Sequence, residues 1–323
     1  MAMSIESTVS ASWKMFAVGI SLAASMATAG TTFLYQQEYI DGIAPYLYND
    51  PGQAVLGTSI FTFNVGNTNQ IPAWEVGDFT GVYNSGAVKA SRERTVAAGW
   101  NGSTAIQVSG YKFGAQLHTY SAPLASAHQP QLKTINFQHA FDQDIRPWSD
   151  AQGPNPRLCM GVTSTVPSNW TGDGSNNQTG VTYLLSDARM PGSRIAVGAL
   201  IFDNKNATDQ TFVDLATGWA VGATYFGGDR YITTSDGSAT FTTSKFSDER
   251  WFGFCMTKQN IVNFYNDFTS KPSYNGSLPP LDFNYLRLNT IVAGGEISIG
   301  SNLDKNGHMA FTYTGLTSHI MTD

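Results

Sequence analysis

The feature that most constrains the fold of this chain is a two-residue alternation between Lys133 and Arg146. Its odd-numbered positions are mostly apolar: Ile135, Phe137, His139, Phe141 and Ile145. Its even-numbered positions are mostly polar: Asn136, Gln138, Asp142, Asp144 and Arg146. This is the period of a half-buried strand, whereas a helix would scatter both sets around its axis. The stretch therefore predicts a sheet with an apolar inner face and an outer face of hydrogen-bonding groups, on which we expect any ligand to bind.

Other segments of the chain share this pattern. Residues 58–65 and 106–113 alternate in the same way. Asn101-Gly102 and Asp236-Gly237 are turn signals, because such pairs favour the positive φ angles of tight hairpins. No long amphipathic helix follows Thr31, and strands do not alternate with helices. The predicted fold class is therefore all-β, an antiparallel β-sandwich or jelly roll.

Composition agrees with this class and narrows the choice of partners. Of the 323 residues, 32 are Gly and 13% are charged, whereas about 25% are charged in average soluble domains. The net charge is −6, and Lys and Arg form no cluster, so we expect no nucleic-acid partner. No repeat and no sharp boundary divides residues 31–323, which we expect to form a single domain.

Residues 1–30 are set apart by a short apolar run. The run covers residues 14–26 and is followed by Ala27-Thr28-Ala29, which resembles the cleavage site of a secretory signal. It is too short to cross a bilayer as a helix, so we expect no membrane span. The residues before it lack a positive bias, and the alternative is a retained arm that docks on another subunit of a homo-oligomer. The first interpretation predicts a secreted protein.

Cys159 and Cys255 are the only cysteines, and each lies in an apolar, strand-like run. If the two strands are neighbours, the thiols could form a disulfide in an oxidising compartment. Two free thiols that pack as small apolar side chains fit the sequence equally well.

Segments of the last third resemble the concanavalin A-like lectin and glucanase jelly rolls. Residues 249–265, Glu-Arg-Trp-Phe-Gly-Phe-Cys-Met-Thr-Lys-Gln-Asn-Ile-Val-Asn-Phe-Tyr, look like two adjacent strands, and residues 294–300 and 307–313 resemble the closing strands of laminin-G-type relatives. The resemblance implies two curved sheets packed face to face, with glycans bound on the concave sheet and its rim loops. The Glu-x-Asp-x-x-Glu strand of the retaining glucanases and the metal motif of legume lectins are absent, so no family residue is carried over.

Three carboxylates are candidates for catalysis. Asp142 and Asp144 stand roughly 7 Å apart on one strand face, a separation that suits a general acid and base acting on a glycosidic bond. Alternatively, Arg146 pairs with one of them on a solvated face. Glu93 lies between Arg92 and Arg94, which would hold it ionised as a base or nucleophile.

A carbohydrate-binding face would use similar groups. Amides and carboxylates form paired hydrogen bonds with sugar hydroxyls, and an aromatic ring stacks on the apolar side of the sugar. The candidate ligand-binding residues are Gln138, Asp142, Asp144, Arg146, Trp148 and Trp170. The alternative for both tryptophans is that they pack against the edge of their own sheet.

Metal-binding signals are incomplete. Residues 173–177, 203–209 and 304–306 offer oxygen ligands of the kind that Ca²⁺ binds, but they lack the bidentate Glu of a full calcium loop, and Asx turns use the same residues. The histidines show no zinc spacing, and we predict no metal site.

These observations lead to two hypotheses of different classes. The first is an exported jelly-roll protein that binds an extracellular polysaccharide and could cleave it, as a polysaccharide lyase or a glycoside hydrolase. The second is a structural subunit of a virion or surface assembly.

Overall fold

The computed structural model describes residues 30–36, 58–63, 74–78, 96–100, 104–109, 112–118, 131–171, 174–205, 207–214, 218–300 and 307–323. These residues form two eight-stranded sheets and one helix, α1 (Lys258–Thr269). Residues 1–29, and with them the apolar run that resembles a signal, lie outside the described part of the chain. Among the described helices, none has the length and apolar character to cross a membrane.

The first sheet has the strand order β13-β14-β8-β16-β6-β5-β4, with β1 also paired to β16. Its strands are β13 (Thr233–Thr234), β14 (Phe246–Met256), β8 (Arg157–Thr171), β16 (Gly307–Thr322), β6 (Lys112–His118), β5 (Thr104–Ser109), β4 (Val96–Trp100) and β1 (Gly30–Gln36). All of these pairs are antiparallel.

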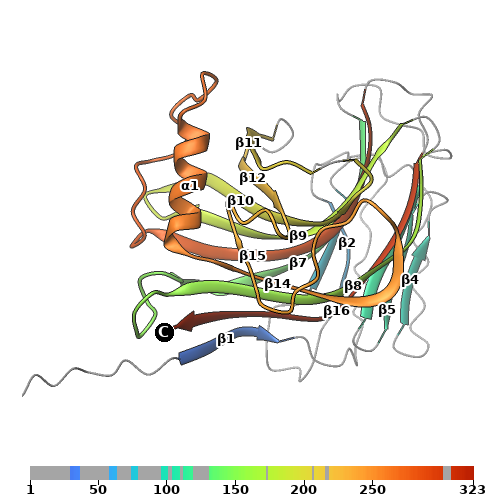
Figure 1. Ribbon diagram of the computed structural model, residues 1–323, viewed down its shortest axis with the longest axis horizontal. Helices are drawn as coiled ribbons and strands as arrows, with labels where there is room; N and C mark the ends of the chain where they lie inside the picture. The colour runs from blue at the N-terminus through green and yellow to red at the C-terminus, as the bar shows by residue number, and fades with distance from the viewer. Residues whose placement is uncertain are drawn as a thin grey trace, which may run out of the picture.

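The second sheet has the order β11-β12-β10-β9-β15-β7-β3-β2. Its strands are β11 (Gln210–Val213), β12 (Ala220–Tyr225), β10 (Met190–Asp203), β9 (Asn176–Asp187), β15 (Leu286–Gly300), β7 (Gln131–Ile145), β3 (Trp74–Asp78) and β2 (Thr58–Phe63). The pair β10–β12 is parallel, and the others are antiparallel. Figure 1 shows both sheets bent in the same sense, with the second sheet on the inside of the bend.

The hydrophobic core lies between the two sheets, and β7 contributes to it as its alternation predicts. Ile135 and Phe137 are fully buried, and the ring of Phe137 lies 4.7 Å from that of Phe113 on the first sheet. His139 shares this inner face, and burial lowers the pKa of its imidazole to about 4, so the ring is neutral at pH 7. The predicted class, an antiparallel-rich β-sandwich, is confirmed.

The two cysteines lie directly opposite each other on β8 and β14 of the first sheet. Their Cα atoms are 3.9 Å apart, and Cys159 and Cys255 form a disulfide. Of the two alternatives that the sequence left open, the structure therefore has the cross-link.

The prediction of two strands in residues 249–265 is wrong in its second half. Strand β14 ends at Met256, and helix α1 begins directly after Thr257. The Thr257 hydroxyl accepts a hydrogen bond from the backbone N–H of Asn260, and the Asn260 side chain accepts one from the backbone N–H of Thr257. This reciprocal cap satisfies free N–H groups in the first turn.

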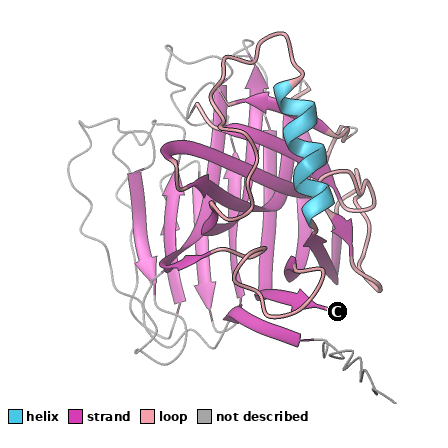
Figure 2. Ribbon diagram, turned by 90° about the vertical axis from the view of Figure 1, so that its left-hand side faces the viewer, coloured by secondary structure: helices cyan, strands magenta, loops and turns pink. Residues whose placement is uncertain are grey.

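The buried face of α1 explains why the helix is stable. Ile261, Phe264 and Phe268 recur at helical spacing, and all three are buried. The helix contacts β11 and β12 of the second sheet and β14 of the first, and it closes one end of the sandwich (Figures 1 and 2). The capping pair and the helical spacing are both present in the sequence, whereas the second strand was expected from the resemblance to jelly-roll proteins.

Candidate functional site

The outer face of the second sheet carries a row of polar side chains that crosses four strands. Glu296 on β15 is in register with Thr134 on β7 on one side and with Gln178 on β9 on the other. Gln178 is in turn in register with Asp203 on β10. Residues in register share a face of the sheet, so these four side chains lie beside one another. We call this set the polar row.

Glu296 is the residue with the most unusual electrostatics in the polar row. Gln178 donates a hydrogen bond from its Nε2 to Oε1 of Glu296. Burial raises the pKa of the Glu296 carboxyl to about 7, and the nearby charges of Asp214 and Asp203 act in the same direction. The carboxyl therefore exchanges its proton near neutral pH, which is the property of a general acid or base.

Asp203 stands at the far end of the polar row and is only 6% exposed. Burial raises the pKa of its carboxyl, whose Oδ1 accepts a 2.7 Å hydrogen bond from the backbone N–H of Lys205. This is the Asx turn that the sequence offered as the alternative to a calcium ligand at this position. In the described part of the chain, no group of three or more His, Cys, Asp or Glu side chains could hold a metal ion.

A strip without side chains borders the polar row. Gly294 on β15 and Gly180 on β9 are directly opposite each other, one outward position along from Glu296 and Gln178. A Cβ atom built on Gly294 would lie 2.0 Å from Oδ1 of Asn136, so the amide of Asn136 lies across this glycine. The glycines thus lower the surface of the sheet beside the polar row and let an amide lie flat on it.

An apolar patch follows beyond the glycine strip. Leu184, Ala196 and Val292 come together on this face, and Trp219 and Val221 pack against them. We call the polar row, Asn136 and Trp219 the concave-face site. It combines amides, carboxyls and an indole on the inner side of the bend in Figure 1, and it can therefore offer both hydrogen bonds and an aromatic surface.

Of the residues predicted from sequence, Gln138 lies on this face, in register with Val292. Asp144 lies near the end of β7, where Arg146 donates to its Oδ2 at 2.6 Å and Nε of Arg287 lies 2.8 Å from its Oδ1. The hydrogen bond from Arg146, helped by the charges of both arginines, lowers the pKa of the Asp144 carboxyl. Asp144 is therefore an ion-paired carboxylate, as the alternative interpretation proposed. The side chain of Asp142 lies outside the described part, so the acid–base pair itself stays a prediction.

The two candidate tryptophans differ in their environment. Trp148 is 2% exposed, its Nε1 donates to the carbonyl of Met256 at 3.1 Å, and its ring meets Phe283 edge to face. An indole enclosed in this way has no face to offer a sugar, so the expectation for Trp148 does not hold. Trp170 is 52% exposed but belongs to β8, so the structure places it on the other sheet from Gln138.

Several residues that the sequence singled out, namely Glu93, Asp173, Asn206 and residues 304–306, lie outside the described part of the chain. Conversely, Glu296 was not among the predicted site residues, although its segment was identified as a strand. Glu296 is distinguished by its position beside residues on β9 and β10, and these residues are distant from it in the sequence.

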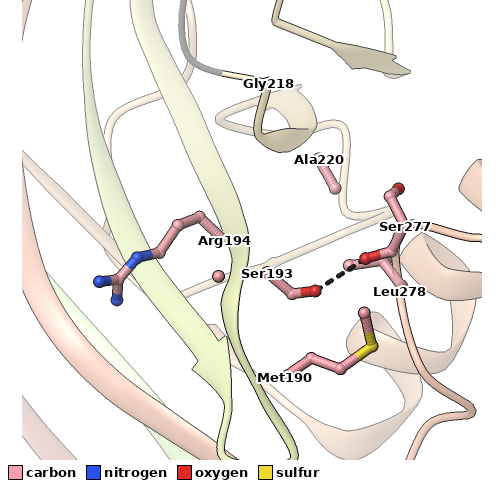
Figure 3. Close-up of a pocket in the computed structure, with 8 residues that line it drawn as sticks. Met190, Ser193, Arg194, Gly218, Ala220, Ser277 and Leu278 are labelled. Atoms are coloured by element: carbon pink, nitrogen blue, oxygen red, sulfur yellow. Dashed lines mark hydrogen bonds between the residues drawn. The ribbon is translucent and has the colours of Figure 1, made fainter.

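A separate depression of 360 Å³ lies at the edge of the second sheet. Its lining is formed by Met190, Gly192, Ser193, Arg194, Gly218, Ala220, Ser277 and Leu278. Figure 3 shows the Ser193 hydroxyl donating to the carbonyl of Ser277, a bond of 2.7 Å, while Arg194 extends to the opposite side of its strand. Because the Ser193 hydroxyl is already engaged and the guanidinium points away, this depression offers less to a polar ligand than the concave-face site.

No protein-family model matches this sequence, and no curated protein matches it. Several solved structures overlap with the fold. The family 11 xylanase from Neocallimastix patriciarum is 9% identical and has a TM-score of 0.33, over 76% of this chain and 90% of that one. The family 12 xyloglucanase from Bacillus licheniformis is 10% identical and also has a TM-score of 0.33, over 91% and 100%. A cellulase derived from the Cel12A of Rhodothermus marinus is 12% identical and has a TM-score of 0.34, over 76% and 91%.

Proposed function

We propose that this protein binds a polysaccharide across the concave-face site. The observation that carries the proposal is the polar row beside a glycine strip and an indole. Sugar hydroxyls are donors and acceptors at once, and the side chains of Gln178, Glu296 and Asn136 match them with both kinds of group. Trp219 offers the aromatic surface that the apolar side of a sugar ring requires. A charged fraction of only 13% favours a neutral glycan over an anionic one.

Hydrolysis of the bound glycan is the second candidate function. It is favoured by the raised pKa of Glu296, because a carboxyl that is still protonated near pH 7 can protonate the oxygen of a leaving group. Glycoside hydrolysis requires a second carboxylate. Asp203 and Asp214 are the carboxyls whose charges act on Glu296, and they are the first choices for this role.

Export is part of the same proposal. The disulfide between Cys159 and Cys255 supports it, because such cross-links persist in oxidising compartments. Mass determination of the N-terminus of the protein from its native source tests export: a start near Gly30 supports it, and an intact Met1 or Ala2 contradicts it.

The binding proposal is tested by titrating soluble neutral polysaccharides into the wild-type chain and into the variants Gln178→Ala and Trp219→Ala. Each variant should bind the preferred polysaccharide more weakly at the concave-face site. Asp248→Asn is a matched control, since this exposed residue lies on the first sheet and pairs with Arg250. Unchanged binding in both site variants would refute the location of the site. Absence of any glycan binding, together with symmetric self-assembly, would favour the structural-subunit hypothesis.

A further inference from the structure

The outer face of the first sheet carries an exposed indole in an unusual position. On β14, Phe252 and Phe254 point into the core, so Trp251 and Gly253 face outward. Gly253 lies directly opposite Gly161 on β8. A Cβ atom built on Gly253 would lie 2.3 Å from Cη2 of Trp251, and one built on Gly161 would lie 3.1 Å from its Nε1. The indole therefore lies flat across the two glycines.

The backbone does not require glycine at either position. Among the described residues, the glycines with positive φ do not include Gly161 or Gly253. Glycine inside a strand is destabilising relative to alanine, because glycine gives the unfolded chain more conformational freedom. Glycine at position 253 instead permits the close approach of the Trp251 ring, which a Cβ atom there would prevent.

The result is an aromatic plane open on one side. Both glycines beneath the ring are buried although they lie on an outer face, while Trp251 itself is 42% exposed. An indole with one face against backbone and the other toward solvent has the arrangement needed to stack on a flat, partly apolar ligand. Stacking of this kind requires the ring to be held parallel to the surface, and the glycine pair holds it so.

Hydroxyl groups lie beside this plane, on β8 and β16. Thr163 lies opposite Trp251, Thr314 lies opposite Thr163, and Thr317 lies opposite Gly161. Farther along, the hydroxyls of Thr165 and Thr312 are 2.8 Å apart. The surface next to the indole thus offers hydroxyls that both donate and accept hydrogen bonds. It also carries an ion pair, because Lys112, in register with Thr314, lies 2.9 Å from Glu249 on β14.

A second exposed indole lies farther along the same sheet, on β8. Trp170 is roughly 20 Å along this strand from Thr163, at the rise of an extended strand. It is in register with His308, whose ring contacts Gln116 at 2.8 Å and Ser168 at 3.1 Å. Two exposed tryptophans therefore stand at either end of a surface rich in hydroxyls.

We infer that this outer face of the first sheet is a second carbohydrate-binding surface, which takes an extended neutral polysaccharide with sugar rings stacked on Trp251 and Trp170. A flat ligand with apolar ring faces and many hydroxyls matches the two indoles and the threonines between them. The inference is independent of the concave-face site, because the two surfaces lie on opposite sides of the sandwich and share no residue.

The test uses the full chain carrying Gln178→Ala and Trp219→Ala, so that binding at the first sheet is measured alone. Affinity electrophoresis against soluble β-linked glucans and xylans should still show retardation of this chain. Adding Trp251→Ala should weaken the residual binding between about two- and tenfold, the range expected for loss of one aromatic stacking contact. Trp170→Ala should weaken it as well.

Gly253→Ala is a second, sharper variant because it keeps the indole but lifts it from the sheet. It should also lower the affinity, whereas Asp248→Asn on the same strand should not. Urea unfolding of each variant establishes that the fold is retained. Residual binding that is equal with and without Trp251 would overturn the inference. A change in oligomeric state on Trp251→Ala, with glycan binding unchanged, would overturn it in favour of a contact between two copies of the chain.

Discussion

Gln178 and Glu296 are joined by a side-chain hydrogen bond across the ladder between β9 and β15, although they are 118 residues apart in the sequence. This bond orients the carboxyl whose pKa burial raises to about 7. The pair therefore links the fold to a measurable pH dependence.

Folding stability should depend on Glu296 between pH 4.5 and 7. In this window the folded state keeps the proton that the unfolded chain releases, so the contribution of Glu296 to stability is fully present below pH 4.5 and is lost as pH rises toward 7. The upper limit of this loss is about 3 kcal/mol, from the difference between the two pKa values. Urea unfolding at several pH values measures it. Glu296→Gln should remove the loss, and an identical pH profile in that variant would contradict the assignment.

Loss of the disulfide should destabilise the fold strongly. Cys159 and Cys255 are separated by 96 residues, and a cross-link that closes a loop of this size lowers the conformational entropy of the unfolded chain, which stabilises the fold by roughly 5 kcal/mol. The double variant Cys159→Ala/Cys255→Ala should therefore unfold at clearly lower urea concentration. A reductant should shift the wild-type transition in the same direction and leave that of the double variant unchanged. An equal response of both chains to the reductant would show that the thiols are not cross-linked.

The N-terminal cap of α1 should contribute measurably to stability. Thr257→Ala removes the hydroxyl that accepts from the Asn260 backbone and should cost about 1 kcal/mol. Gln259→Ala in the same turn is the control, because this side chain is exposed and its bond to Asn263 lies on the helix surface. Equal stability of Thr257→Ala and the wild type would contradict the role of the cap.

Trp148 and Trp219 should separate stability from binding. Trp148→Ala removes a buried ring and its hydrogen bond to Met256, which should cost about 3–5 kcal/mol. Glycan affinity, measured well below the melting temperature, should be retained in this variant. Trp219→Ala should lower glycan affinity with a smaller effect on stability. Reversed results would place the binding surface near Trp148.

Strand β7 and the segment after β14 show how much of the structure local sequence patterns predict. The alternation from Ile135 to Asp144 predicted strand β7 and its buried face, because which side a residue faces depends only on the pleat of its own strand. The resemblance that predicted a second strand after Met256 failed, because Thr257 ends β14 and caps a helix. The apolar residues there recur at helical spacing, and their face packs toward β12 and β14.

The sequence alone determined the β class and the buried and polar faces of strand β7, since these follow from side-chain order along the backbone. Only the tertiary structure decided that Cys159 meets Cys255, that Trp148 is enclosed while Trp170 is exposed, and that Glu296 lies between Gln178 and Thr134. The physical reason is that strand register is set by contacts between residues far apart in the chain, and those contacts leave no periodic signal in any single segment.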